Sequence, residues 1–348
     1  MALIPAFAGM SAEGWRTRLV TDHENPDRPL TAWYVTTGEA GFRTQARGLA
    51  SALAESPREL SVDLRAPWRL LPGVLAAPMA FQALTPGSDR PAPPWPDLVV
   101  SCGRRATAVA IAIRRAGRGR TLGVHVQNPL TAVSAFDLVV AMDHDGVSGA
   151  NVLNVPTALH DVTPARLAVA AEAWRGRLAQ GEGPMAGVLL GGTTRHHPFT
   201  PQSARDLIDG LARLRAEGWR IAVTPSRRTP DDVLEAFASR FAGDDGVYLW
   251  DRAGENPYLG ILALGDRIVA TSDSVSMVSE ALATPHPVEV FGDDGGARHS
   301  LFLGGLIDKG LVRRFTGDPV SAKAGGPIDS TTIAAEAVRR LLQARAAA

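Results

Sequence analysis

The strongest signal in this sequence is Thr271-Ser272-Asp273-Ser274-Val275-Ser276-Met277-Val278-Ser279-Glu280. It follows a short apolar run, 267–270, which predicts a buried strand, and it opens a second run, 275–283, which predicts a helix. Serine and aspartate at a strand-to-helix junction leave hydroxyls and backbone N–H groups at the carboxyl edge of a sheet. Open α/β sheets bind phosphates at that edge, so this segment predicts a phosphate site.

Two side chains of this segment share one helix face. Ser276 and Glu280 are four residues apart, which places them one helical turn from each other. The serine hydroxyl would then reach a phosphate, while the carboxylate, one turn deeper, would accept hydrogen bonds from a ribose diol. The alternative is a plain helix start, with Asp273 or Ser274 as the N-cap and Glu280 exposed to solvent.

The composition is that of an ordinary soluble protein, and 348 residues are enough for two domains. The 36 basic residues balance 36 acidic ones, so no global field recruits nucleic acid or an anionic membrane. The only lysines, Lys309 and Lys323, lie outside any G-x-x-x-x-G-K-[ST] loop, which disfavours a P-loop nucleotidase. A Schiff-base lysine enzyme is disfavoured as well, because both lysines lie late, near glycine-rich turns.

Cysteine usage and hydropathy indicate a cytoplasmic protein. The single cysteine, Cys102, excludes a disulfide framework and a thiolate metal cluster, and it is expected to be a small core residue. The sequence has no secretory signal pattern and no run of about 18 apolar residues. We therefore expect a cytoplasmic location, with peripheral contact to the inner membrane as a further option.

That membrane option depends on the apolar, proline-interrupted segment 68–84, which contains Trp68, Met79 and Phe81. Arg65 and Arg69 lie just before and inside it. Such a segment can enter a membrane interface. More often a segment of this kind packs against its own domain.

Short apolar runs alternate with helical patterns along the whole chain, which predicts two parallel sheets covered on both faces. The glycine-rich stop at 180–184 separates two series of such units. We predict an N-terminal Rossmann-like domain over 1–183 that includes an interdomain helix, and a C-terminal Rossmann-like domain over 184–328. A terminal helix over 329–348 is expected to pack back on the first domain. Two doubly wound α/β domains then face one cleft, where ligands collect.

In the first domain, the wall of this cleft is predicted to include Gly38-Glu39-Ala40-Gly41-Phe42 with Gln45, because glycines allow a ligand close to backbone N–H groups. Arg104 and Arg105 follow another strand at a helix start, where they oppose the helix dipole, which suggests an anionic ligand. His144 and Asp145 follow a third strand. A carboxylate that orients an imidazole produces a plausible general base, and a capped turn is the alternative.

In the second domain, the string Gly191-Gly192-Thr193-Thr194-Arg195-His196-His197 is rich in groups that bind phosphate. Its histidine pair lacks zinc spacing, so no metal is expected. Ser226-Arg227-Arg228 follows the next strand, and Tyr258 precedes a helix from which it could stack on a base. Each turn by itself is ordinary. Arginine, glycine and hydroxyl residues at the ends of four successive strands favour a binding site.

The loops together resemble those of the ELM family, named after plant members linked to mitochondrial fission, whose bacterial members are regarded as glycosyltransferases of the GT-B type. The resemblance covers roughly 33–317. It is carried by Gly38 to Gln45, Gly103-Arg104-Arg105, His144-Asp145, Asn151-Val152-Leu153, Gly191-Gly192, Ser226-Arg227-Arg228-Thr229-Pro230, Asn256-Pro257-Tyr258 and, most specifically, Asp273 to Ala281. Many relatives have histidine where this chain has Phe42, which puts the identity of the catalytic base in doubt.

The resemblance implies a GT-B-like fold and metal-independent transfer, with no cofactor, from a nucleoside diphosphate sugar, expected to be UDP-linked. The acceptor is expected in the cell envelope, lipid-linked for example. His144 or Asp145 would deprotonate it, and Arg227 or Arg228 would stabilise the departing charge. Two alternatives stay open: a nucleotide-sugar 2-epimerase, and a non-catalytic scaffold that recruits a membrane-remodelling partner. The donor would contact Gly191, Gly192, Thr193, Ser226, Arg228, Tyr258, Asp273, Ser274, Ser276 and Glu280, and the acceptor side would be Gly38, Glu39, Gly41, Gln45, Arg104 and Arg105.

Overall fold

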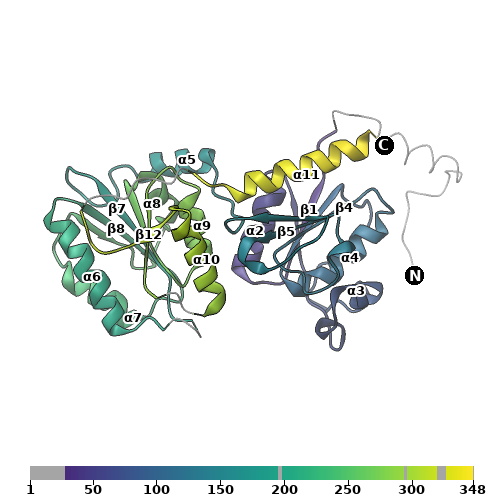
Figure 1. The fold of residues 1–348 in the computed structure, drawn as a ribbon, viewed down its shortest axis with the longest axis horizontal. Coiled ribbons are helices and arrows are strands. Elements are labelled where there is room, and N and C mark those ends of the chain that lie inside the picture. Colours follow the sequence, from purple (N-terminus) through teal and green to yellow (C-terminus); the bar gives the residue numbers. More distant parts are fainter. Residues whose placement is uncertain (1–27, 195–197, 294–295, 320–326, 348) are drawn as a thin grey trace, which may run out of the picture.

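Two parallel six-stranded sheets, one in each of two lobes, organise the chain (Figure 1). The computed structural model describes residues 28–194, 198–293, 296–319 and 327–347. The first-lobe sheet has the order β2-β1-β3-β4-β5-β6. Its strands are β1 (Ala32–Thr36), β2 (Arg58–Ser61), β3 (Leu98–Cys102), β4 (Leu122–Val126), β5 (Leu138–Met142) and β6 (Val152–Val155), and its helices include α2 (Ala40–Ser51), α3 (Gly73–Ala76) and α4 (Thr107–Ala116).

The second-lobe sheet has the order β12-β11-β10-β7-β8-β9. Its strands are β7 (Met185–Leu190), β8 (Arg220–Pro225), β9 (Val247–Leu249), β10 (Arg267–Thr271), β11 (Val288–Phe291) and β12 (Arg313–Arg314). Its helices are α6 (Pro201–Ala216), α7 (Asp231–Arg240), α8 (Tyr258–Leu264), α9 (Val275–Leu282) and α10 (Ala297–Asp308), joined to the first lobe by α5 (Pro164–Trp174).

The central strands are buried at every position because helices cover both faces of each sheet. This holds for β1, β3, β4 and β5 in the first lobe and for β7 and β10 in the second. Strands of this kind consist of near-continuous apolar residues, which explains why the short runs in the sequence located them. The predicted fold class, two Rossmann-like doubly wound α/β units, is confirmed.

The order of the strands determines where ligands can enter each lobe. In an open α/β sheet the crevice lies beyond the carboxyl ends of the strands, at the point where the strand order reverses. That point lies between β1 and β3 in the first lobe and between β7 and β10 in the second. The loops that begin at Gly38 and Gly103 flank the first crevice. The loops that begin at Gly191 and Ser272 flank the second.

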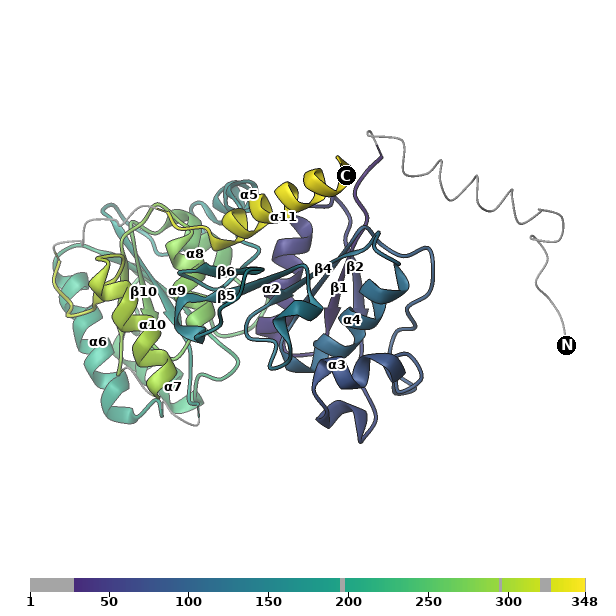
Figure 2. The same ribbon diagram turned by 45° about the vertical axis from the view of Figure 1, so that its right-hand side comes forward.

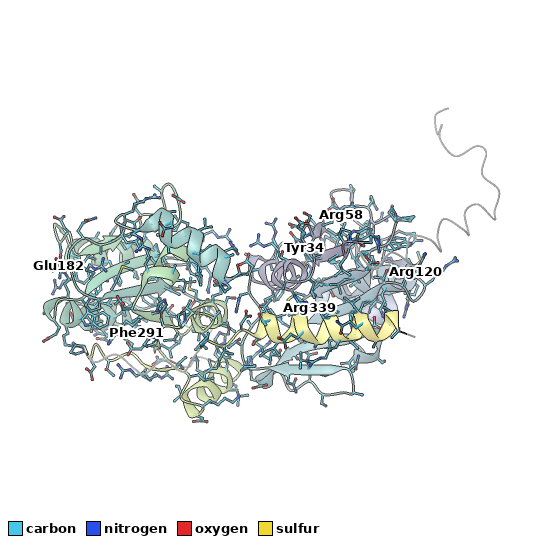
Figure 3. All side chains as sticks on the ribbon, turned by 90° about the horizontal axis from the view of Figure 1, so that it is seen from above. Tyr34, Arg58, Arg120, Glu182, Phe291 and Arg339 are labelled. Atoms are coloured by element: carbon cyan, nitrogen blue, oxygen red, sulfur yellow. The ribbon has the colours of Figure 1, made fainter. Side chains whose placement is uncertain are left out.

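The last helix, α11 (Ser330–Ala346), returns the chain to the first lobe. Ala334, Ala335 and Val338 are buried in the same apolar cluster as Ala46 and Leu49 of α2. Figure 3 looks down on α11 and labels Arg339, whose guanidinium donates to the Ala52 carbonyl over 2.7 Å. The chain leaves the first lobe after β6 and returns to it at the start of α11. A hydrogen bond of 2.6 Å between the Thr157 and Ser330 hydroxyls joins these two connections.

The segment 68–84 folds over the first lobe rather than extending from it. Trp68 and Phe81 are half-buried against the first-lobe core, and Phe81 stacks on Trp95 with 5.7 Å between ring centroids. Met79, Leu70 and Leu75 are exposed, by 39%, 64% and 61%. In the part of the chain that the structure describes, no helix has the length and hydropathy needed to cross a membrane.

Candidate functional site

Asp273 ties together three turns at the carboxyl edge of the second-lobe sheet. Its Oδ1 accepts a hydrogen bond of 2.7 Å from the Thr271 hydroxyl. Its Oδ2 accepts two of 3.0 Å, from the Gly192 N–H and from the Arg228 guanidinium. The Asp273 side chain is only 5% exposed. This carboxylate therefore holds the turns after β7, β8 and β10 in register.

The glycines of the first of these turns are required by close packing. A Cβ at Gly191 would lie 2.0 Å from Asp273 Oδ1, and one at Gly192 would lie 2.0 Å from the Arg228 carbonyl oxygen. The Ser226 hydroxyl donates to the Gly191 carbonyl over 2.7 Å, and the Gly191 N–H donates to the Thr271 hydroxyl over 2.7 Å. The polar groups of Gly191, Gly192 and Ser226 are thus bonded within the protein, where they shape the turn.

We expect Gly192→Ala to lower the free energy of unfolding by roughly 1–3 kcal/mol, because the new methyl group collides with backbone that cannot move aside. Thermal or urea unfolding measures the change. The control is Gly41→Ala, whose Cβ would meet only the Ser276 Oγ at 3.8 Å, an ordinary contact. Equal unfolding midpoints for the two variants would show that the Gly192 turn is not closely packed.

Beside these turns lies a small cavity of 170 Å³, called here the turn cavity. Its wall carries hydroxyl groups from the start of α6 and the end of β10. The Thr193 hydroxyl accepts over 3.2 Å from the N–H of Phe199, which lines the cavity. Arg195, His196 and His197 lie outside the described residues. The lining consists of Gly192, Pro198, Phe199, Thr200, Ser203, Thr271, Ser272, Asp273, Phe291, Gly292 and Asp293.

Helices α9 and α2 lie on the adjoining sides of the two lobes (Figure 2), and a Cβ built on Gly41 of α2 would contact the Ser276 Oγ of α9. Ser274 is the N-cap of α9, and its hydroxyl accepts from the Met277 N–H over 3.3 Å. Ser276, in the first turn, faces Gly41 in the first turn of α2 at the 3.8 Å noted above. The first N–H groups of a helix have no partner within it, so both ends favour an anion between them.

One turn beyond Ser276, Glu280 and Tyr258 form the floor of a larger cavity of 660 Å³, called here the cleft cavity. The Tyr258 hydroxyl is buried next to the Glu280 carboxyl, but it forms no hydrogen bond of regular geometry with any described residue. Burial raises the pKa of Glu280 to about 7, although the Tyr258 hydroxyl partly opposes this rise. The walls carry Thr44 of α2 and Asp161, Ala165, Arg166, Val169, Ala170, Ala173, Trp174, Glu255, Asn256 and Leu259.

The first lobe contributes a cavity of 370 Å³, called here the first-lobe cavity. Glu39 and Arg105 line it and pair with each other over 3.1 Å, and Arg105 also pairs with Asp63 over 2.8 Å. The charge of Arg105, read from the sequence as a sign of an anionic ligand, is therefore balanced by two carboxylates. Arg104 donates one bond of 3.3 Å to the Leu70 carbonyl and also lines the cavity.

Sequence reasoning missed one wall of this cavity, the loop after β4. Gln127, Asn128 and Leu130 line it. Gln127 and Leu130 have φ angles of 75° and 49°, in the left-handed region that side chains rarely adopt. Backbone strain of this kind collects at functional sites. No sequence signal marked it, because neither residue is a glycine or an asparagine.

His144 and Asp145 also line the first-lobe cavity, in a short 3-10 turn over Asp143–Asp145 after β5. The two side chains are 5% and 1% exposed, and 3.8 Å separates His144 Nε2 from Asp145 Oδ1. Burial lowers the pKa of His144, although Asp145 opposes this. The imidazole is therefore neutral at physiological pH and able to accept a proton. Arg298 of α10 reaches into the cavity from the second lobe and pairs with Asp145, a contact that the sequence gave no reason to expect.

The remaining predicted residues lie around these cavities rather than in them. Gln45 is buried inside α2. Gly38, at φ 95°, forms the exposed turn before α2. Arg227 is exposed and forms no side-chain hydrogen bond or ion pair with any described residue. Among the described residues, no group of three or more His, Cys, Asp or Glu side chains is placed to hold a metal ion.

Comparison with known sequences identifies relatives across most of the chain. Residues 40–342 match the protein family described as mitochondrial fission ELM1. Mitochondrial fission protein ELM1 of Arabidopsis thaliana is 31% identical over 276 residues, which cover 72% of this chain and 65% of the plant protein. The match thus spans just under two thirds of that relative's length. An uncharacterized protein of Rickettsia prowazekii is 23% identical over 257 residues, 63% of this chain and 72% of the relative.

Comparison with solved structures concerns the fold. The UDP-GlcNAc 2-epimerase of Methanocaldococcus jannaschii superimposes with a TM-score of 0.53 at 12% identity, covering 90% of this chain and 99% of that one. A protein of Listeria monocytogenes described as a putative UDP-N-acetylglucosamine 2-epimerase gives 0.51 at 11% identity, covering 91% and 97%. The chain therefore has the two-lobed, GT-B-like architecture, with the cleft between the lobes.

Proposed function

The chain belongs to the mitochondrial fission ELM1 family, as its motifs predicted, and on this premise we propose that it is a GT-B-type glycosyltransferase. In this proposal it moves a sugar from a nucleoside diphosphate donor to an acceptor of the cell envelope. One observation carries the proposal. Both cavities are built by the two lobes together: Glu280 of α9 lines the cleft cavity with Thr44 of α2, and Arg298 of α10 lines the first-lobe cavity with His144 and Asp145.

The donor would extend along the cleft from one cavity to the next. Its nucleoside would occupy the cleft cavity, with the ribose diol donating to Glu280 and the base against Tyr258. Its diphosphate would lie between the first turns of α9 and α2, at Ser274, Ser276 and Gly41. This placement supports a nucleotide-binding role for the C-terminal domain, 184–328, and an acceptor role for the N-terminal domain, 1–183. The terminal helix, 329–348, would belong with the latter.

The chemistry would need no metal in this proposal. The acceptor hydroxyl would lose its proton to Asp145 or His144, and its oxygen would bond to the anomeric carbon of the sugar. The bond from that carbon to the diphosphate would break, and the electron pair would leave on the phosphate oxygen. Fixed donors at the α9 N-terminus and a nearby arginine would stabilise this charge. UDP is the expected nucleotide, as the motifs implied.

A lipid-linked acceptor fits the surface around the first-lobe cavity. Leu130, which is 61% exposed, lines the mouth, and the Arg104 guanidinium donates to the carbonyl of the exposed Leu70. Exposed apolar residues next to arginine suit the interface of a membrane. Peripheral membrane contact would then involve Leu70, Leu75 and Met79, with Trp68 and Phe81 supporting them from within the lobe.

The test is a thermal-shift screen of UDP, GDP, ADP and dTDP, followed by product analysis with the matching labelled nucleotide sugar. We expect one nucleotide to raise the midpoint of unfolding, because a ligand that binds only the folded state stabilises it. We also expect the labelled sugar to be transferred to an acceptor molecule in a membrane extract. Absence of stabilisation by all four nucleotides at millimolar concentration would contradict the proposal.

Two other functions give different results in the same assays. The link of the plant relative to mitochondrial fission favours a scaffold that recruits a membrane-remodelling partner, and such a scaffold would bind a partner protein but no nucleotide. The fold shared with 2-epimerases favours epimerisation, and an epimerase would convert the donor sugar without any acceptor. Transfer that requires the acceptor distinguishes the proposed transferase from both.

A further inference from the structure

Arg298 is an ion-pair bridge from the second lobe to a candidate base of the first lobe. It lies in the first turn of α10, and its guanidinium pairs with Asp145 Oδ1 across the cleft. The Arg298 side chain is 58% exposed, whereas the Asp145 side chain is 1% exposed. The pair therefore consists of an enclosed carboxylate and an arginine that is free to change its position.

Both carboxylate oxygens of Asp145 already have a partner. Oδ1 is taken by Arg298, and Oδ2 accepts the Met142 N–H over 3.2 Å. A general base must lie within hydrogen-bond reach of the proton that it removes, with a lone pair available. Asp145 lines the first-lobe cavity but is blocked there by Arg298.

Arg298 also lies close to the proposed diphosphate site. The next residue, His299, places its Nε2 3.3 Å from the carbonyl oxygen of Asp273, which directly precedes the N-cap of α9. A cation in the first turn of a helix is opposed by the helix dipole, so Arg298 needs an anion nearby. Asp145 supplies that anion in this structure. A diphosphate at the α9 N-terminus would supply a second one, with more charge.

We propose that Arg298 exchanges partners, leaving Asp145 for the diphosphate of the donor, and that this exchange uncovers Asp145 as the base. This inference depends on the proposed glycosyltransferase function. The proton of the acceptor hydroxyl goes to Asp145 Oδ1 as the acceptor oxygen bonds to the anomeric carbon. The bond from that carbon to the diphosphate breaks, and its electron pair leaves on the phosphate oxygen that Arg298 contacts. Transfer is thereby restricted to molecules that already hold a donor.

The exchange predicts opposite effects of the two partners on nucleotide affinity. Arg298→Gln removes a phosphate contact, so we expect the affinity to fall about tenfold. Asp145→Asn removes the competitor for Arg298, so the affinity should rise roughly threefold to tenfold while transfer is lost. Arg298→Lys, which keeps the charge, should recover part of the affinity. Isothermal titration with the nucleoside diphosphate that gives the largest thermal shift measures all three.

Lys309→Gln is the matched control, because Lys309 also forms an interlobe ion pair, with Asp143 over 2.9 Å, and lies outside the proposed donor site. We expect its affinity to stay within about twofold of the parent. If the ion pairs only hold the lobes together, the nucleotide affinity of Asp145→Asn, Arg298→Gln and Lys309→Gln should change in the same direction. That result would overturn this inference but not the proposed function. If the parent binds no nucleoside diphosphate, both the proposed function and this inference are contradicted.

Discussion

Glu280→Gln is expected to weaken nucleoside diphosphate binding by about tenfold to hundredfold without unfolding the protein. A hydrogen bond to a charged group contributes roughly 1.5–3 kcal/mol, and in the proposed complex two ribose hydroxyls donate to this one carboxylate. The glutamine keeps the shape of the side chain, so the cleft cavity remains packed. Isothermal titration at pH 8, where the carboxyl is ionised, measures the effect.

Glu255→Gln is the matched control for this variant. Glu255 lines the same cavity but is 58% exposed and pairs with Arg177 over 2.9 Å. The same chemical change there should alter the affinity by less than about twofold. Equal losses in the two variants would mean that the general charge of the cavity, rather than a specific contact of Glu280, attracts the nucleotide.

The same residue predicts how nucleotide affinity changes with pH. With the pKa of Glu280 near 7, the carboxylate that would accept the ribose hydroxyls in the proposed complex forms only as the pH rises through that value. We expect binding to be about tenfold weaker at pH 6 than at pH 8, because about a tenth of the carboxyl groups are ionised at pH 6. In Glu280→Gln this change in affinity between pH 6 and pH 8 should be absent. Titration of the nucleotide phosphate would affect the parent and the variant alike, so the comparison distinguishes the two causes.

Stability without nucleotide should change in the opposite direction. The unfolded chain loses the Glu280 proton near the ordinary glutamate value of 4.5, whereas the folded protein keeps it to about pH 7. Between these values the folded state binds more protons, so the contribution of Glu280 to stability falls as the pH rises. In thermal unfolding, the midpoint of Glu280→Gln relative to that of the parent should be higher at pH 8 than at pH 5. A constant difference between the two proteins would contradict the raised pKa.

The largest loss of stability is expected from Glu289→Leu in the second-lobe sheet. Glu289 on β11 and Arg267 on β10 are 1% and 0% exposed and pair over 3.3 Å, and Arg313 donates to the same carboxylate over 2.6 Å. The Arg267 guanidinium also lies over the Trp219 ring, 4.3 Å from its centroid. Removing the carboxylate takes away the buried counter-charge that pairs with both arginines, which costs about 3–5 kcal/mol.

We expect this loss to lower the midpoint of thermal unfolding by roughly 10 °C. Glu172→Leu serves as the control, because Glu172 pairs with Arg175 over 3.2 Å on the surface of α5, where both side chains are more than half exposed. That variant should stay within about 0.5 kcal/mol of the parent. Similar midpoints for the two leucine variants would show that the buried pair contributes no more than an exposed one.

The sequence located the segments that form the two sheets because those strands are short, continuous apolar runs. Predicted bounds moved by a few residues. The helix expected over 275–283 is Val275–Leu282, and the terminal helix expected over 329–348 is Ser330–Ala346. The strand β12 was missed, since its two residues, Arg313 and Arg314, are both charged. Local apolar pattern predicts an element well only when burial on both faces selects its residues.

The motif at 271–280 joins a strand to a helix, as predicted, but several of its polar groups bond to the protein itself. Ser274 does cap α9, which was the plain alternative, while Asp273 is occupied by Thr271, Gly192 and Arg228. The last two partners lie 81 and 45 residues away along the chain. A sequence motif identifies which polar groups are present, but it does not show which of them are already bonded to each other.

What the sequence determined by itself was the family and the pair of doubly wound sheets. These follow from local periodicity and from residue types at fixed spacing. Both are properties of residues that are close together along the chain. Only the tertiary structure placed Arg298 on Asp145, 153 residues apart, put Glu280 beside Tyr258 and strained the loop at Gln127 and Leu130. These contacts depend on how two lobes and distant turns come together, and electrostatic partners at such separations leave no pattern in a single sequence.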